Sequence, residues 1–210
     1  MAGGTAARRA ARVLNMPLLS LAEYEALAAA AHGHLCAGQI LGLRMALHGV
    51  TLLGLDDPAG QDRKRLVCVV EIDRCMTDAI AVVTGCRLGK RTLKFRDFGK
   101  AAATFCDVRE NRAVRVAARE SSKERARALY PEIESKNQQQ MRAYRELPDE
   151  ELFAVEWVRV TLGAEDLPGY KAPRVVCAQC GEGVSFRREV VRQGRVLCRA
   201  CAGERYYEPA

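Results

Sequence analysis

The first regular pattern of hydrophobic and polar positions along the chain predicts a helix over residues 21–32, LAEYEALAAAAH. Ser20 precedes this segment and Glu23 follows three positions later, which is the spacing of a capping box. We expect the helix to end near Gly33, because glycine readily adopts the left-handed conformation that closes a helix.

A second helix is predicted to begin near Cys36 and to continue through the apolar stretch AGQILGLRMALHG. Gly38 and Gly42 lie four positions apart, so they share one face of this helix. Because they have no side chain, we expect them to allow another backbone to pack closely there. The segment DDPAGQDRK after it has the composition of a loop.

Segments rich in β-branched residues then predict strands. Residues 65–73 (RLVCVVEID) form the first, and residues 113–118 (AVRVAA) and 153–162 (FAVEWVRVTL) form later ones. Residues 92–108 (TLKFRDFGKAAATFCDV) are predicted to form a hairpin that turns at residues 97–99.

Helices are predicted between and after these strands. In DRCMTDAIAVVTG, Asp73 can cap a helix that ends at Gly85. Ser121 and Glu124 have the spacing of a second capping box, and Pro131 is predicted to start or kink a further helix. Helices that come first, followed by strands joined by hairpins, indicate an α+β fold with a mostly antiparallel sheet.

Composition and charge limit the classes of protein to consider. With 210 residues, 49% of them hydrophobic, the chain can bury one substantial core and carry a small additional domain. The formal charge of +7 is spread along the chain, which is weak support for nucleic-acid binding. No apolar run approaches the roughly 20 residues that span a bilayer, and no apolar block follows Arg8, Arg9 and Arg12. We therefore expect a cytoplasmic protein with neither a membrane nor a nucleic-acid partner.

Four of the nine cysteines form two C-x2-C pairs, CAQC (Cys177, Cys180) and CRAC (Cys198, Cys201). Two such turns can present four thiolates to one tetrahedral ion, so this spacing favours one structural Zn²⁺ per chain. An iron site like that of rubredoxin and a dithiol redox pair are the alternatives.

The segment between the two cysteine pairs predicts a hairpin that turns at Gln193 and Gly194, and AGERYYE after them predicts a short helix. This order is typical of a treble-clef or ribbon zinc module. About 35 residues bury too little apolar surface to fold without the ion. We therefore divide the chain into a flexible basic tail (1–17), an α+β core (18–166), a linker (167–173) that contains two prolines and a glycine, and the zinc module (174–210).

The stretch AHGHLCAGQILG places His32, His34 and Cys36 at alternate positions. These side chains point to one side only if the backbone is extended, which is plausible beyond the helix break at Gly33. Unpaired amides at the amino end of the second helix would favour a thiolate at Cys36. The stretch is therefore a candidate metal or thiol site, and a helix cap beside a packed cysteine is the alternative.

A second group of polar residues surrounds the helix predicted to follow the first strand. It contains Asp73, Cys75, Asp78, Cys86 and Lys90. Cys75 lies at the beginning of this helix, and Asp78 shares its face at i+3, whereas Cys86 lies just past the end. By contrast, Cys68 and Cys106 alternate with apolar strand positions and are predicted to be core residues. His48 is predicted to be a surface or terminal residue.

Five segments in consistent order make the chain similar to the E-subunit family of formylmethanofuran dehydrogenase. They are HGHLCAGQILGLRMA, DRCMTDAIAVVTGCRLGK, FRDFGKAAATF, LPDEELF and the final cysteine pairs, and together they extend over about residues 18 to 204. The resemblance implies an α+β core, a carboxy-terminal treble-clef zinc finger and homodimers. It also implies association with molybdenum or tungsten enzymes of one-carbon metabolism, through their subunits or their cofactor.

The resemblance further implies a pocket of histidine and cysteine side chains in the core, which could hold a second metal ion. Its candidate residues are His32, His34, Cys36, Cys75, Asp78, Cys86 and Lys90. In this hypothesis Cys36 is a ligand or nucleophile, His34 a second ligand or a base, and Cys75 a further ligand. Asp78 would orient a ligand and Lys90 would hold an anionic group. A freestanding cysteine–histidine enzyme and a zinc-finger interaction or regulatory module are the two alternative functions.

Overall fold

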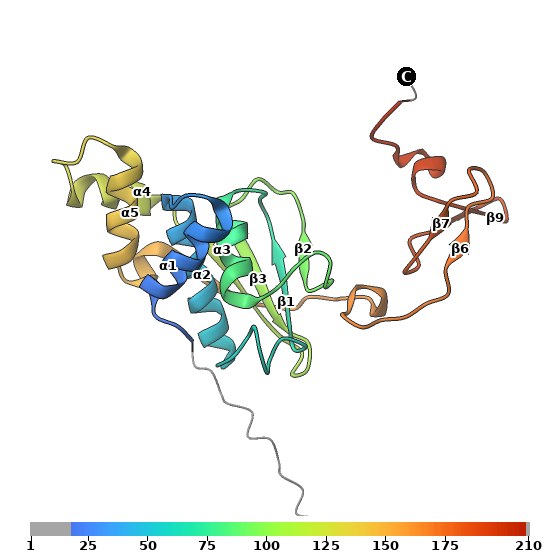
Figure 1. Ribbon diagram of the computed structural model, residues 1–210, viewed down its shortest axis with the longest axis horizontal. Coiled ribbons are helices and arrows are strands. Elements are labelled where there is room, and N and C mark those ends of the chain that lie inside the picture. Colours follow the sequence, from blue (N-terminus) through green and yellow to red (C-terminus); the bar gives the residue numbers. More distant parts are fainter. Residues whose placement is uncertain (1–17, 209–210) are drawn as a thin grey trace, which may run out of the picture.

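The computed structural model describes residues 18–208, so the predicted basic tail at residues 1–17 lies outside the described part. Figure 1 shows a core of helices and strands joined by an extended segment to a small carboxy-terminal module. The core elements are α1 (Leu21–His32), α2 (Ala37–Leu53), β1 (Leu66–Val70), α3 (Cys75–Thr84), β2 (Leu93–Phe95), β3 (Ala102–Asp107), β4 (Arg112–Ala118), α4 (Ser121–Leu129), α5 (Lys136–Glu146), α6 (Asp149–Leu152) and β5 (Phe153–Val158). The carboxy-terminal elements are η1 (Ala164–Asp166), β6 (Val175–Val176), β7 (Gly183–Val184), β8 (Val190–Arg192), β9 (Arg195–Leu197) and η2 (Ala200–Glu204).

The first helix begins and ends as the sequence predicts. Ser20 and Glu23 form both hydrogen bonds of the capping box, and Gly33 closes α1 at φ 92°. Cys36 is extended, at φ −141° and ψ 168°, and precedes the first residue of α2. The backbone between the two helices is therefore as predicted, and α2 continues one turn further than expected, to Leu53.

The core sheet has five strands in the order β2-β1-β3-β4-β5, and β1–β2 is the only parallel pair among the described residues. The predicted hairpin over residues 92–108 is wrong, because β1 lies between β2 and β3. The amides of Arg96, Phe98 and Lys100 donate to the carbonyls of Val70 and Glu71, so the connecting segment wraps around the end of β1. The remaining pairs are antiparallel, which confirms the α+β fold with a mostly antiparallel sheet.

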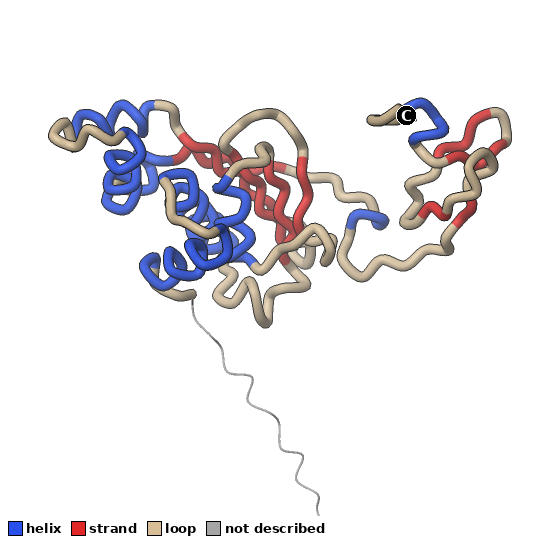
Figure 2. Tube along the Cα trace, turned by 45° about the horizontal axis from the view of Figure 1, so that its top comes forward, coloured by secondary structure: helices blue, strands red, loops and turns tan. Residues whose placement is uncertain are grey.

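Helices lie together on one face of this sheet (Figure 2). There α2 crosses α3 closely: a Cβ atom at Gly42 would lie 2.4 Å from the carbonyl oxygen of Met76. Further along α2, a Cβ at Gly49 would lie 2.3 Å from the Phe105 ring of β3. The prediction that a glycine of this helix allows close backbone packing is confirmed at Gly42, and α3 is the partner.

Three predicted helix starts differ from the structure. Arg74, not Asp73, precedes the first residue of α3, and it makes no side-chain capping bond. Ser121 is already inside α4, which also begins without a capping side chain. Pro131 follows the end of α4 instead of starting a helix, and the cap of α5 is Ser135, which accepts from the Gln138 amide at 3.4 Å.

The carboxy-terminal module contains two short hairpins, β6-β7 and β8-β9. Gln193 and Gly194 join β8 to β9 with φ values of 51° and 73°. Two consecutive positive φ values define the tight turn whose twist suits a hairpin. This predicted hairpin is confirmed. A short helix, η2, also follows it, but it covers Ala200–Glu204 and not the whole predicted segment, and Gly203 at φ 102° interrupts its helical backbone.

Candidate functional site

The candidate core site lies where three helix ends meet. His32 ends α1, Cys36 stands before α2, and Cys75 is the first residue of α3. A Cβ at Gly38 would lie 3.5 Å from the Cys75 Cβ and 3.8 Å from the Cys36 Sγ, so the two cysteines flank this glycine. The close approach of α2 to α3 therefore brings together two thiols that are 39 positions apart in sequence.

At the same helix ends, histidine and carboxylate side chains contact one another. The His32 Nδ1 lies 2.8 Å from the Asp78 Oδ2, and the His32 and His34 rings are 4.9 Å apart between centroids. The His32 side chain is 20% exposed and that of Asp78 is 59% exposed, so the group opens to solvent. Because Asp78 takes up one ring nitrogen of His32, the other nitrogen is left for a ligand.

Burial, followed by a hydrogen bond with Cys36, raises the pKa of the Cys75 thiol. A thiol with a raised pKa keeps its proton at neutral pH, and a metal ion has to displace that proton before it can bind. The Cys36 and Cys75 thiols are therefore close enough to form a hydrogen bond with each other.

One polar residue of this region was not found from the sequence. The Asn137 Oδ1 accepts a hydrogen bond from the Ala37 amide at 3.0 Å and so satisfies a free amide at the start of α2. Asn137 belongs to α5, 100 positions along the chain. No local pattern indicates such a partner, because packing of α5 against α2 places it.

Cys86 and Lys90 do not join this group. They follow the carboxyl end of α3, whereas Cys75 begins it, so about 16 Å of helix separates Cys86 from Cys75. Cys86 is buried, and a hydrogen bond with Cys68, with further bonds from Thr84 and Thr92, lowers the pKa of its thiol to about 7. Lys90 lies exposed at the surface.

The remaining cysteine and histidine predictions are also placed by the structure. Cys68 and Cys106 are buried, as predicted for core residues. His48 is only partly exposed, and its Nδ1 lies 2.9 Å from the Asp149 Oδ2. Its side chain is 22% exposed and so reaches the surface, and α6 additionally places a carboxylate beside it.

The carboxy-terminal cysteines form a different kind of site. Cys177, Cys180, Cys198 and Cys201 place their sulfur atoms within 4.8 Å of one another. Within residues 18–208 this is the one group of three or more potential ligand atoms that are so close. A tetrahedral shell with Zn–S bonds of about 2.3 Å needs sulfur atoms about 3.8 Å apart, and the Cys180 and Cys198 sulfurs are 3.9 Å apart. The donor set and its spacing therefore fit one structural zinc ion.

Backbone amides prepare this shell for a cation. Amides of Cys180, Cys198 and Gln179 donate toward the Cys177 sulfur and lower the pKa of its thiol to about 6. The Cys201 amide likewise donates to the Cys198 Sγ at 3.4 Å. Donors of this kind favour the thiolate, which is the form that binds zinc.

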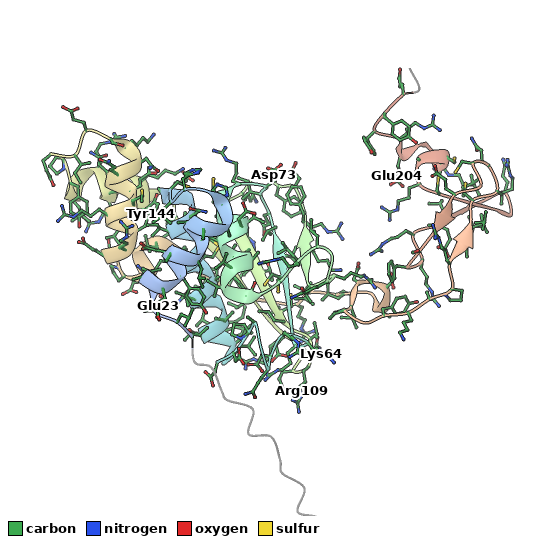
Figure 3. The ribbon with its side chains drawn as sticks, viewed as in Figure 1. Glu23, Lys64, Asp73, Arg109, Tyr144 and Glu204 are labelled. Carbon is green, nitrogen blue, oxygen red and sulfur yellow. The ribbon has the colours of Figure 1, made fainter. Side chains whose placement is uncertain are left out.

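The two sites lie in separate parts of the molecule. Asp73 and Glu204, both labelled in Figure 3, mark them: Asp73 is two residues before Cys75, and Glu204 is three residues after Cys201. Asp73 lies on the core and Glu204 lies on the distant module. No helix within residues 18–208 is both long and apolar enough to cross a membrane.

These features define a class of protein with an α+β core, a thiol–imidazole group between its helices and a four-cysteine zinc module. Residues 31–154 match the family described as "FmdE, Molybdenum formylmethanofuran dehydrogenase operon". Residues 171–207 match the family described as "Prokaryotic dksA/traR C4-type zinc finger". Because the first match extends over more than half of the chain, the chain belongs to the FmdE family.

Known proteins that are similar to the chain include the following two. A crystal structure of an FmdE-like protein from Syntrophus aciditrophicus, named for tungsten formylmethanofuran dehydrogenase, superposes with a TM-score of 0.62 and 21% identity, over 90% of this chain and 96% of that chain. This likeness confirms the fold. A "Probable S-adenosyl-L-methionine-binding protein" from Archaeoglobus fulgidus is 32% identical over 202 residues, which cover 83% of this chain. The match spans about half (51%) of that relative.

Proposed function

We propose that the protein is a metal-binding accessory protein whose core group binds a second metal ion, separate from the structural zinc. Two observations carry this proposal: the contact of 2.8 Å between His32 and Asp78, and the two cysteines that flank Gly38 at the same helix ends. A carboxylate that holds one nitrogen of a histidine fixes the ring and makes the other nitrogen a better ligand. Sulfur and imidazole ligands suit zinc, iron or cobalt.

Each residue has a stated role in this proposal. Cys36 and Cys75 supply thiolates, and His32 supplies the ring nitrogen that faces away from Asp78. His34 is a fourth ligand, or a base if the site is catalytic. The ligand atoms of these four side chains are not gathered around one point, so binding an ion requires them to move together, whereas the sulfur atoms of the four-cysteine site lie within 4.8 Å of one another.

Cobalt titration tests the second site. Protein that already contains one equivalent of zinc is titrated with Co²⁺, and the absorption of cobalt–thiolate bonds is recorded. We expect one further equivalent to bind, and this absorption to disappear in Cys36→Ala and in Cys75→Ala. Asp78→Asn should weaken the binding by about 10- to 100-fold, as the loss of a histidine's partner does elsewhere.

Cys86→Ala is the matched control, because it removes a core thiol at the far end of α3. It should leave the cobalt spectrum unchanged once its folding has been checked by circular dichroism. Wild-type protein without a cobalt–thiolate band, or a band that survives in Cys36→Ala, would refute the second metal site.

We also propose that the protein assembles as a homodimer and acts beside a molybdenum or tungsten enzyme of the formylmethanofuran dehydrogenase kind. Membership of the FmdE family supports the enzyme as partner. For the dimer, the edge strand β5 offers Val155 and Trp157, which are 42% and 52% exposed. Sedimentation velocity should show a dimer that Trp157→Glu weakens, and immobilised protein should retain the purified enzyme complex.

An enzyme that acts through Cys36 is the second candidate function, since this partly exposed thiol stands before the 17-residue helix α2 with no side-chain capping bond of its own. S-adenosylmethionine is the first ligand to test, because the Archaeoglobus relative is named for binding it. Binding of S-adenosylmethionine in calorimetry, together with Co²⁺ binding that Cys36→Ala leaves intact, would favour the enzyme over the metal-binding protein.

A further inference from the structure

A basic cleft lies between the edge of the core sheet and the carboxy-terminal module. Its volume is about 620 Å³, within the range of small-molecule sites. The charged residues that line it are Arg91, Lys94, Arg96, Asp166, Arg188 and Arg199. The cleft therefore has five cations and a single carboxylate around one space, and none of these residues belongs to the two sites above.

Elements far apart in the sequence hold this cleft together. The Arg188 guanidinium of the module contacts Asp166 at 2.5 Å, and Lys94 of the edge strand β2 lies 3.8 Å from the same carboxylate. Asp166 is thus shared by two cations. Burial, and then the nearby charges of Arg91 and Arg188, lower the pKa of Lys94 despite its contact with Asp166. Positive charge in the cleft is only partly balanced by the protein.

Two contacts hold the Arg91 side chain in place, and one of its N–H donors has no acceptor among the described residues. Its guanidinium lies 3.9 Å from the centre of the Phe186 ring, and its Nη1 donates to the Tyr170 carbonyl at 3.4 Å. Its Nη2 is buried and has no hydrogen-bond acceptor among the described residues. A buried donor without a partner is destabilising, and an acceptor from a ligand would satisfy it.

We propose that this cleft binds a small phosphate-bearing ligand of the nucleoside diphosphate class. Guanidinium groups pair with phosphate oxygens through two parallel hydrogen bonds, which accounts for the predominance of arginine. Apolar side chains of the lining, Leu93, Val160 and Leu162, offer a surface for a flat base. A nucleic acid is less suited, because it requires a basic stripe along a surface, whereas these cations converge on one cavity.

Zinc and this ligand are expected to depend on each other. Arg188 and Arg199 belong to the zinc module, and Arg199 lies between Cys198 and Cys201. Loss of the ion would unfold the wall that carries these two cations. The ligand should consequently bind the zinc-loaded chain better than the metal-free chain.

Isothermal titration calorimetry on the zinc-loaded full chain tests the proposal with ADP, pyrophosphate and adenosine. We expect ADP to bind more tightly than pyrophosphate, and adenosine not to bind measurably. The double variant Arg91→Gln/Lys94→Met should weaken ADP binding at least tenfold. The double variant Arg109→Gln/Lys123→Gln removes the same charge from exposed sites elsewhere and should leave the affinity unchanged.

Two further measurements distinguish a loss of the binding site from a loss of the fold. Thermal unfolding and zinc content of both double variants should match the wild type, so that a loss of binding reports on the cleft. Three outcomes would overturn the proposal: no detectable binding of ADP, an equal loss in the control variant, or a single-stranded oligonucleotide that binds more tightly than ADP and displaces it. The last would assign the cleft to nucleic acid.

Discussion

The carboxy-terminal four-cysteine site and the core thiol–imidazole group contain similar donor atoms, yet they are built in different ways. In the module, two turns of four residues hold Cys177, Cys180, Cys198 and Cys201 within 4.8 Å of one another. In the core, Cys36 and Cys75 adjoin because two helices cross at glycines. The module depends on its ion for stability, whereas the core folds on apolar packing.

Because the two sites are built differently, they are suited to different roles. A closed shell of four thiolates leaves no position open for a substrate, which is typical of structural zinc. The core group opens to solvent, as the 59% exposure of Asp78 shows, and its ligand atoms are not gathered around one point. Of these two sites, the core group is therefore the one with room for a substrate.

The largest expected effect is from loss of one module ligand. Cys180→Ser should remove the bound zinc and unfold the module, because structural zinc contributes about 10–16 kcal/mol to folding in isolated zinc-finger peptides. The core should keep its unfolding temperature, since no residue of its main apolar cluster belongs to the module. Zinc content, limited proteolysis and thermal unfolding measure the two parts separately.

A joint loss of both parts in Cys180→Ser would contradict the separation of module and core. Treatment with a chelator provides a control without mutation, and it should reproduce the proteolysis pattern of the variant.

The next effect concerns the helix crossing that brings Cys36 and Cys75 together. Gly42→Ala places a Cβ 2.4 Å from the Met76 carbonyl oxygen, so α2 and α3 must move apart. We expect a loss of about 1–3 kcal/mol in the free energy of unfolding, as is usual for overpacking. The second metal equivalent should weaken, while the zinc of the module stays bound.

Gly89→Ala is the matched control, because a Cβ there meets no atom within 4 Å. Chemical denaturation and cobalt titration of both variants give the result. Should Gly42→Ala leave both unchanged, the crossing would not determine the geometry of the core group.

The smallest expected effect is the dependence of core stability and zinc binding on pH. Burial opposes ionisation of Asp107, but hydrogen bonds from Arg65 and from the amides of Glu110 and Arg109 outweigh it and lower the pKa of this carboxyl. The stabilisation is therefore present above the unfolded value of about 3.9 and is lost as pH falls through the lower folded pKa. The module should release zinc at higher pH, because protons compete for its thiolates.

Acid titration followed by tryptophan fluorescence and by a zinc indicator should thus show zinc release before unfolding of the core. Asp107→Asn should cost about 1–3 kcal/mol at neutral pH and flatten the acid dependence of core stability. Asp56→Asn, at an exposed loop position, is the control. It should change neither the stability of the core at neutral pH nor the acid dependence of that stability. If zinc release and unfolding of the core occurred at the same pH, the predicted order of the two events would be refuted.

Local sequence determined much of this protein. The capping box at Ser20, the helix end at Gly33, the hairpin turn at Gln193 and each pair of zinc ligands follow from residues only a few positions apart. Their hydrogen bonds and φ angles depend on neighbours in the chain, so a sequence pattern is sufficient to predict them. The α+β class followed for the same reason.

Only the tertiary structure decided the rest. The pairing of β2 with β1, the partnership of Asn137 with the start of α2 and the cleft around Arg91 join segments that lie far apart in the chain. Such contacts depend on which surfaces become buried together on folding, and the local sequence does not specify this.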